Sequence, residues 1–208
     1  MEIRRLILIP LAAIATSGLL LAGCGPSVPS LPKLESNAVV LAFGDSLTHG
    51  TGVSPDESYP AVLGKLIDRK VVGSGVPGEI SETGLRRLPD VLDEVKPRLL
   101  ILCHGGNDFL QRLDEGAVAR NVRAMANLAR ERGIAVVIVA TPKPGLGVAK
   151  VAFYEALGKE LTIPVEGDVL AEVLASRKLK SDLVHPNAEG YRRIADAVAT
   201  LLRRAGAV

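Results

Sequence analysis

Short apolar runs alternate with amphipathic stretches along most of this chain. The apolar runs predict five strands, at residues 38–43, 70–72, 98–103, 134–140 and 163–165. Apolar spacing of three or four predicts helices over residues 58–69, 81–96, 117–132, 148–161, 169–178 and 186–204. Pro89 is the weak point of its helix, because an internal proline can kink or split it. The alternation predicts an α/β fold, with a parallel sheet covered by helices on both faces.

The first 37 residues depart from this pattern. After a short basic start, residues 6–22 form an almost uncharged apolar run that ends in Leu-Ala-Gly-Cys at Cys24. The run is near the lower length limit for a membrane-spanning helix, but Pro10 and the small residues before Cys24 fit an export signal better. We therefore expect a signal peptide at residues 1–23, an extended tether with too few apolar residues to pack at 24–37, and one domain at 38–208.

Composition narrows the possible functions. The net charge of +2 does not indicate the strongly basic surface that nucleic-acid binding requires. Aromatic residues make up only 3% of the chain and Trp is absent, which weakens any function that depends on stacking against sugars or bases.

Polar clusters follow the predicted strands. They are Gly44-Asp45-Ser46, the turn at residues 73–78, Gly105-Gly106-Asn107-Asp108, and residues 182–186 before the last helix. Parallel sheets bind ligands beyond the carboxyl ends of their strands, so we expect these clusters to meet at one rim.

Ser46 has two interpretations at this stage. It, or Asp45, caps the next helix, or its hydroxyl is a nucleophile at the end of a central strand. A nucleophilic serine needs a base and an orienting group. His185 follows Asp182 by three residues, so one turn brings the two side chains together, although a helix start with an incidental histidine has the same pattern.

Acyl transfer also needs hydrogen-bond donors where negative charge develops. The glycine turn at Gly78 can present backbone N–H groups, and Asn107 can present a side-chain amide, although both clusters also read as plain turns. Each cluster alone is a weak signal, and their joint occurrence on one rim is a stronger one.

These motifs resemble those of the SGNH, or GDSL, hydrolases. The resemblance runs over residues 38–205 and is carried most specifically by FGDSLTHGTGVSPDESYPAVL and GLRRLPDVLDEVKPRLLILCHGGNDFL, which are similar to the bacterial arylesterase, thioesterase and lysophospholipase group. It implies a three-layer α/β/α sandwich on a five-stranded parallel sheet, with no metal or cofactor. By position, it implies Ser46 as nucleophile, His185 as base and Asp182 as orienting acid. The implied oxyanion donors are the N–H groups of Ser46 and Gly78 and the side chain of Asn107.

Two stretches depart from that family pattern. Cys103-His104 stands where relatives commonly carry Glu-Leu, and Gly78-Glu79-Ile80 stands where they commonly carry Gly-Asp-Thr. We expect these residues to line or underlie the cleft and to affect substrate preference. His49, His104 and Cys103 are expected to take no part in catalysis, with Cys103 a small buried hydrophobe.

Leu-Ala-Gly-Cys resembles the bacterial lipoprotein signal. This implies lipidation of Cys24 and a stable anchor at an extracytoplasmic membrane face of the cell envelope. With Cys24 acylated, only Cys103 remains and no internal disulfide can form.

The leading functional hypothesis is a lipid-anchored serine esterase acting on small acyl esters or thioesters, including lysophospholipids. A carbohydrate O-acetylesterase is the alternative enzyme, and a surface lipoprotein that keeps the fold as a binding module is the non-enzymatic one.

Overall fold

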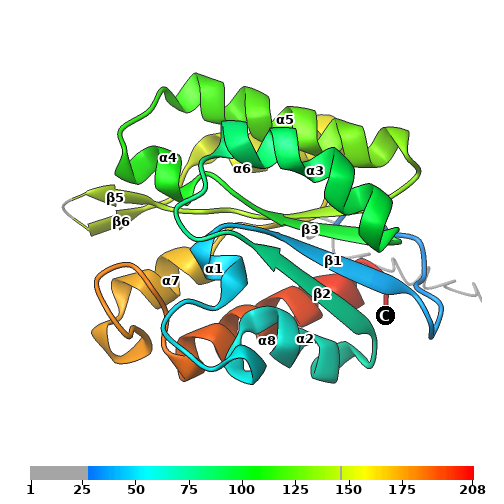
Figure 1. Cartoon of the computed structure of the whole chain (residues 1–208), viewed down its shortest axis with the longest axis horizontal. Helices are drawn as coiled ribbons and strands as arrows, with labels where there is room; N and C mark the ends of the chain where they lie inside the picture. The colour runs from blue at the N-terminus through cyan, green and yellow to red at the C-terminus, as the bar shows by residue number, and fades with distance from the viewer. Residues whose placement is uncertain (1–27, 146) are drawn as a thin grey trace, which may run out of the picture.

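The computed structural model describes residues 28–145 and 147–208. Its central sheet has five parallel strands in the order β2-β1-β3-β4-β7. The strands are β1 (Val39–Gly44), β2 (Lys70–Gly75), β3 (Leu99–Cys103), β4 (Ala135–Val139) and β7 (Val165–Glu166). Helices cover both faces of the sheet (Figure 1), so the predicted α/β/α sandwich on a five-stranded parallel sheet is confirmed.

The helices divide into two layers. One layer holds α3 (Ser81–Val95), α4 (Gly106–Leu110), α5 (Glu115–Glu131) and α6 (Ala152–Leu161). The other holds α1 (Ser46–His49), α2 (Tyr59–Ile67), α7 (Val169–Ala175) and α8 (Ala188–Arg204). Two short 3-10 helices, η1 (Pro55–Glu57) and η2 (Arg177–Leu179), lie in the connecting loops. Despite Pro89, α3 is neither split nor interrupted.

The core lies on both sides of the sheet because successive strand residues point to opposite faces. In β1, Val40 and Ala42 pack with residues of α2 and α8, whereas Leu41 and Phe43 pack with residues of α3, α5 and α6. All four are fully buried. A strand covered on both faces needs apolar residues at every position, which is why β1 reads as an unbroken apolar run.

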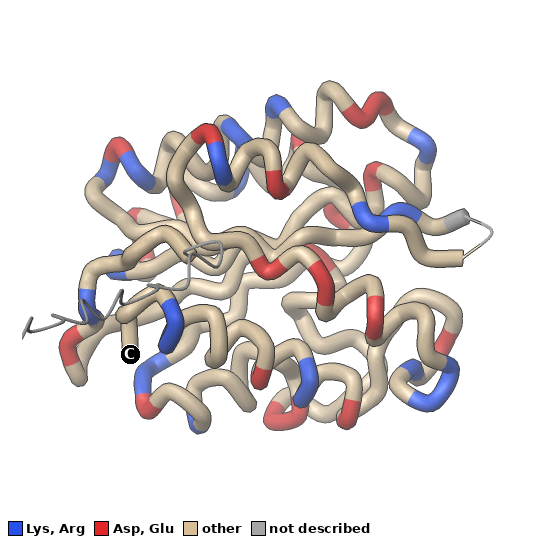
Figure 2. Tube along the Cα trace, turned by 180° about the vertical axis from the view of Figure 1, so that it is seen from behind, with Lys and Arg blue, Asp and Glu red and all other residues tan. Residues whose placement is uncertain are grey.

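Charged residues lie mostly on the helices and loops outside the sheet, with both signs interspersed (Figure 2). In α8, for example, Tyr191, Ile194 and Val198 are buried, whereas Glu189 and Arg193 pair with each other on the exposed face. This one-sided burial gives the three-to-four spacing that predicted the helix.

Several boundaries differ from those predicted. The glycine turn after the second strand begins later, because β2 continues to Gly75. The predicted turn at residues 105–108 opens the short helix α4. Part of the predicted loop and helix at residues 141–161 is a two-stranded hairpin of β5 (Lys143–Gly145) and β6 (Gly147–Ala149), and α6 begins only at Ala152.

The segment that precedes β1 is partly packed against the domain. Leu34 is buried, and its N–H donates to the carbonyl of Ala207 at 2.8 Å. The N–H of Leu31 donates to the carbonyl of Ala205, also at 2.8 Å. The expectation that residues 24–37 do not pack is therefore wrong for Leu31 and Leu34, because a few apolar side chains suffice when the chain that follows α8 offers carbonyl acceptors.

The predicted signal peptide at residues 1–23 and the lipidation site Cys24 lie outside the described residues. Within residues 28–145 and 147–208, no helix combines the length and the apolar character that crossing a bilayer requires.

Candidate active site

Ser46 is held at the carboxyl end of β1. Asp45 caps α1, because its Oδ1 accepts from the N–H of Leu47 at 3.0 Å, and Ser46 is the first residue of that helix. Gly44 allows the end of β1 to lie close to β3, since a Cβ there would lie 2.1 Å from the carbonyl oxygen of Cys103. The cap of the helix is thus Asp45, which leaves the Ser46 hydroxyl free for another partner.

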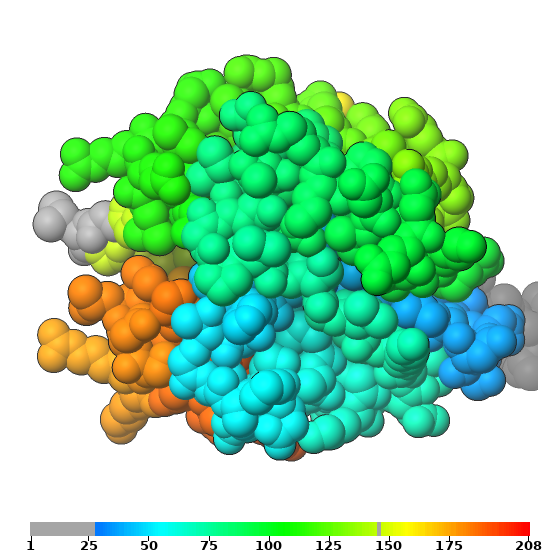
Figure 3. All heavy atoms as spheres, in the orientation of Figure 1, coloured from blue at the N-terminus to red at the C-terminus, as the bar shows by residue number. Residues whose placement is uncertain are grey.

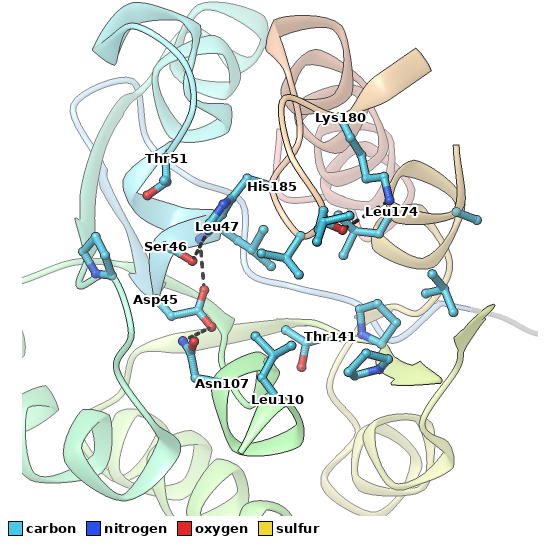
Figure 4. Close-up of a pocket in the computed structure, with 18 of the residues that line it drawn as sticks. Asp45, Ser46, Leu47, Thr51, Asn107, Leu110, Thr141, Leu174, Lys180 and His185 are labelled. Carbon is cyan, nitrogen blue, oxygen red and sulfur yellow. Dashed lines mark hydrogen bonds between the residues drawn. The ribbon is translucent and has the colours of Figure 1, made fainter. Parts of the chain in front are cut away.

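That partner is His185. Its Nε2 lies 3.0 Å from Oγ of Ser46 (Figure 4), and its Nδ1 lies 2.7 Å from Oδ2 of Asp182. A carboxylate accepts hydrogen bonds, so Nδ1 carries the proton and Nε2 is left as an acceptor for the Ser46 hydroxyl. The structure therefore brings together three of the predicted site residues in one hydrogen-bond chain.

Asp182 is fixed by its own loop. Its Oδ1 accepts from the N–H groups of Val184 and His185, each at 2.8 Å, while Oδ2 faces the imidazole. Burial acts to raise the pKa of Asp182, but the hydrogen bond from the imidazole and the two backbone N–H bonds outweigh it and lower that pKa. Asp182 therefore stays ionised at pH values at which a carboxyl group in water begins to take up a proton.

Ser46, Gly78 and Asn107, the three residues predicted to supply oxyanion donors, all line one cleft. Gly78 has a φ of +80° and nothing within 4 Å of a Cβ position. The amide of Asn107 is engaged, since Nδ2 donates to Oδ2 of Asp45 at 3.2 Å and to the carbonyl of Glu79 at 3.0 Å. In the described chain, the N–H groups of Ser46 and Gly78 donate to no other protein group.

The cleft has a volume of about 620 Å³ and is mainly apolar. The hairpin side contributes Pro142, Pro144 and Val148, and α4 and α7 contribute Leu110 and Leu174. The loop before α8 and the segment around α4 lie at the same end of the molecule (Figure 3). This arrangement offers a serine hydroxyl, a proton acceptor and backbone donors beside an apolar surface, which suits the attack on a carbonyl attached to an apolar chain.

The remaining candidates lie away from the reacting groups. His49 is exposed at the end of α1 and does not line the cleft. Cys103 is buried in β3, and burial raises the pKa of its thiol well above the ordinary value, so it remains a neutral hydrophobe. Glu79 and His104 are both buried beneath the cleft rather than lining it.

Two contacts around the site were not predicted from the sequence. The side chain of Arg87 donates to both carboxylate oxygens of Glu79, at 2.9 and 2.7 Å. Asp108 accepts from the N–H and the hydroxyl of Ser81, at 2.8 and 2.6 Å, and so ties α4 to α3. Asp108 lies within a recognised motif, but Arg87 carries no local signal, because its partners Glu79 and Ser74 lie 8 and 13 residues away and outside its own helix.

Fold and site together define a serine hydrolase of the α/β sandwich type. The chain belongs to the GDSL-like lipase/acylhydrolase family, whose model matches residues 42–193. It is therefore a hydrolase of a class that acts on ester bonds.

Among its relatives is esterase TesA of Pseudomonas aeruginosa, which is 33% identical over 131 residues. That match covers 61% of this chain and 65% of TesA, just under two thirds of its length. Thioesterase 1/protease 1/lysophospholipase L1 of Escherichia coli K12 is 28% identical over 172 residues, which are 79% of this chain and 83% of that protein. The crystal structure of TesA has a TM-score of 0.72 and 26% identity, and covers 80% of this chain and 99% of the other.

Proposed function

We propose that this protein is a serine esterase in which Ser46 is the nucleophile, His185 the general base and Asp182 the group that orients the imidazole. The hydrogen-bond chain from Ser46 Oγ to His185 Nε2 at 3.0 Å, and from His185 Nδ1 to Asp182 at 2.7 Å, carries this proposal. Such a chain has the geometry that nucleophilic catalysis by serine requires.

In the proposed reaction, the Ser46 oxygen attacks the ester carbonyl while its proton moves to Nε2 of His185. The tetrahedral intermediate collapses when that proton passes to the leaving group, and an acyl-enzyme remains. Water, activated by the same imidazole, then releases the acid and restores Ser46. Asp182 stays ionised throughout and stabilises the imidazolium.

The oxyanion is proposed to accept from the N–H groups of Ser46 and Gly78 and from the amide of Asn107. Both amide hydrogens of Asn107 already have acceptors, so the oxyanion must compete for one of them. The bond to Asp45 at 3.2 Å is the longer one, and it is the bond that we expect to yield.

The substrates are proposed to be acyl esters or thioesters, including lysophospholipids. The apolar cleft of about 620 Å³ supports this class, as do relatives named esterase, thioesterase and lysophospholipase. A carbohydrate O-acetylesterase has less support, because the described residues that line the cleft include no Phe, Tyr or Trp and sugars usually stack on such rings.

The test is hydrolysis of p-nitrophenyl esters of increasing acyl length, beside an acetylated glycan, by a chain that starts at Pro26. We expect Ser46→Ala to abolish ester hydrolysis and to prevent labelling by a serine-directed phosphonate. Ser54→Ala is the matched control, because Ser54 is exposed and does not line the cleft. Unchanged turnover in the Ser46 variant would contradict the mechanism, and activity confined to the glycan would favour the alternative.

We further propose that Cys24 is lipidated and holds the enzyme at an extracytoplasmic face of a bacterial membrane. Residues 31 and 34 bond to the chain just after α8, which lies at the end of the domain away from α4 and α7 (Figure 1), the helices that contribute to the cleft. The four steps from Cys24 to Val28 reach roughly 14 Å at most. An anchor at Cys24 would therefore leave the cleft open on the side away from its membrane.

The mass of the mature N-terminal peptide from native membranes tests this proposal. A lipidated peptide that begins at Cys24 is expected, and Cys24→Ser should abolish labelling by a fatty-acid analogue. An unmodified peptide that retains Met1 would indicate a spanning helix instead, and would leave the esterase proposal untouched.

A further inference from the structure

A second polar cluster lies beneath the cleft and outside the Ser46–His185–Asp182 chain. It consists of Glu79, Arg87 and His104. The guanidinium of Arg87 holds the Glu79 carboxylate through two hydrogen bonds of 2.9 and 2.7 Å, and Nε2 of His104 lies 3.2 Å from Oε2 of the same carboxylate. The side chains of Glu79 and His104 are 3% and 0% exposed, so neither can reach a substrate.

The charges of this cluster are balanced. Burial acts to raise the pKa of Glu79, but the hydrogen bonds from His104 and Arg87 and the guanidinium charge lower it to about 2. Glu79 is therefore an anion paired with Arg87, and the imidazole donates to it from Nε2. The other ring nitrogen, Nδ1, is buried without a partner among the described residues.

The surroundings are shaped to hold the imidazole. At Gly84 in α3, a Cβ would lie 2.3 Å from Nε2 of His104, so only glycine leaves room for the ring. The guanidinium of Arg87 lies over the ring of Phe43, with its carbon 4.1 Å from the ring centroid. These contacts restrict where the imidazole of His104 and the guanidinium of Arg87 can lie.

Glu79 connects this cluster to the oxyanion side of the cleft. Its main-chain carbonyl accepts from Nδ2 of Asn107 at 3.0 Å, and Gly78 precedes it in the chain. Anchoring the Glu79 side chain therefore fixes the carbonyl that directs the Asn107 amide. Nη1 of Arg87 also donates to the hydroxyl of Ser74 at 2.7 Å, which ties the end of β2 to the cluster.

Glu79 and His104 also stand at the two stretches where the sequence departs from the pattern of the family it resembles. They are 25 residues apart in the chain and contact each other directly. The residues at the two departures therefore belong to one hydrogen-bonded cluster.

We propose that Glu79, Arg87 and His104 are positioning residues that set the Asn107 amide for transition-state stabilisation through the Glu79 carbonyl. The proposal rests on the proposed esterase function. It predicts that the side chain of Glu79 affects catalysis only through Asn107, which distinguishes positioning from a general contribution to folding.

The test is a double-mutant cycle measured by steady-state hydrolysis of a short p-nitrophenyl ester. Glu79→Gln should lower kcat at least about tenfold with little change in KM, and Asn107→Ala should lower it roughly 10²–10³-fold, because an oxyanion donor acts on the transition state alone. The double variant should be no slower than Asn107→Ala. Arg86→Gln is the matched control, because this neighbouring arginine pairs with Glu82 on the exposed face of α3.

The free energy of unfolding of each variant is measured by urea unfolding. If Glu79→Gln is too unstable to purify, Arg87→Lys enters the same cycle, because lysine keeps the charge but loses the two-pronged bond. Multiplying effects in the double variant, a normal kcat for the folded Glu79 or Arg87 variant, or a normal kcat for Asn107→Ala would each overturn the inference. If Ser46→Ala still abolishes activity in those cases, the esterase proposal stands.

Discussion

Nδ2 of Asn107 lies 3.2 Å from Oδ2 of Asp45, the residue that caps the helix of Ser46. One carboxylate thus serves two functions, because its other oxygen accepts from the N–H of Leu47. Burial raises the pKa of Asp45, and the hydrogen bond from the N–H of Leu47 opposes only part of that rise. The position of the Ser46 helix and the direction of the Asn107 amide depend on the same side chain.

Replacing Asp45 with asparagine is expected to separate these two functions. The side-chain amide of the Asp45→Asn variant has one carbonyl oxygen, so it can accept from Leu47 or from Asn107 but not from both. The local cap bond should persist and the Asn107 bond should be lost, which lowers kcat at least about tenfold while the free energy of unfolding changes by less than ~1 kcal/mol. Ester hydrolysis and urea unfolding measure the two effects.

Asp114→Asn is the matched control for that experiment. Asp114 also caps a helix, since it accepts from the N–H of Ala117 at 2.8 Å, but it has no contact with the cleft. Its replacement should leave kcat unchanged. A full kcat in the Asp45 variant would show that Asn107 needs no second acceptor.

Gly84 provides a test of the buried cluster that leaves its polar groups in place. Because a Cβ at this position would lie 2.3 Å from His104 Nε2, Gly84→Ala should displace the imidazole and lower the free energy of unfolding by roughly 1–3 kcal/mol. Gly116→Ala is the control, since its neighbours are flexible side-chain ends, and the change should be neutral or stabilising by up to ~1 kcal/mol. Equal stability of the two variants would contradict the tight fit.

The layer order of the fold could be predicted because it depends on local patterns. Strands buried on both faces read as continuous apolar runs, as β3 does, and α8 shows its apolar face at helical spacing. The hairpin of β5 and β6 was missed because its strands are only three residues long, with Pro144 in the first. A strand that short has no detectable period.

Only the site residues that lie in recognisable motifs could be predicted from the sequence. Ser46, Gly78, Asn107, Asp182 and His185 lie in recognisable polar clusters. The structure brings four of them to one cleft, and Asp182 contacts the imidazole of His185. The cluster of Glu79, Arg87 and His104 beneath the cleft could not be predicted. Its residue types are common at any protein surface, and the contacts join different parts of the chain. The bond between Glu79 and His104 is such a contact, and no spacing rule relates the two positions.

The lowered pKa of Glu79 makes a prediction about stability and pH. A carboxyl whose pKa is about 2 in the folded state and near its ordinary 4.5 in the unfolded chain stabilises the fold above pH 4.5. That contribution is lost as the pH falls from 4.5 towards 2. Glu79→Gln should therefore be less stable than the wild type at about pH 6, and the difference should shrink steadily below pH 4.5. Urea unfolding across this range measures it, and a difference independent of pH would contradict an ionised Glu79.

The last prediction concerns the charge of the substrate. Arg177 and Lys180 border the apolar cleft, and neither forms an ion pair with a described residue. The only carboxylate among the described residues that line the cleft is Asp45, which is buried. The exposed charge at the cleft is therefore positive. Among esters of equal acyl length, those with a phosphate or carboxylate group should have a higher kcat/KM than neutral ones.

Removing both cations should abolish that preference. In Arg177→Gln/Lys180→Gln, kcat/KM for the anionic ester should fall roughly fivefold or more, on the scale of about 1 kcal/mol for an exposed charge pair, while the neutral ester is little affected. Lys178→Gln is the matched control, because Lys178 is exposed on the same short segment but does not line the cleft. Raising the salt concentration should reduce the preference of the wild type, since mobile ions screen exposed charges. An equal loss for both esters would mean that these residues shape the cleft rather than select charge.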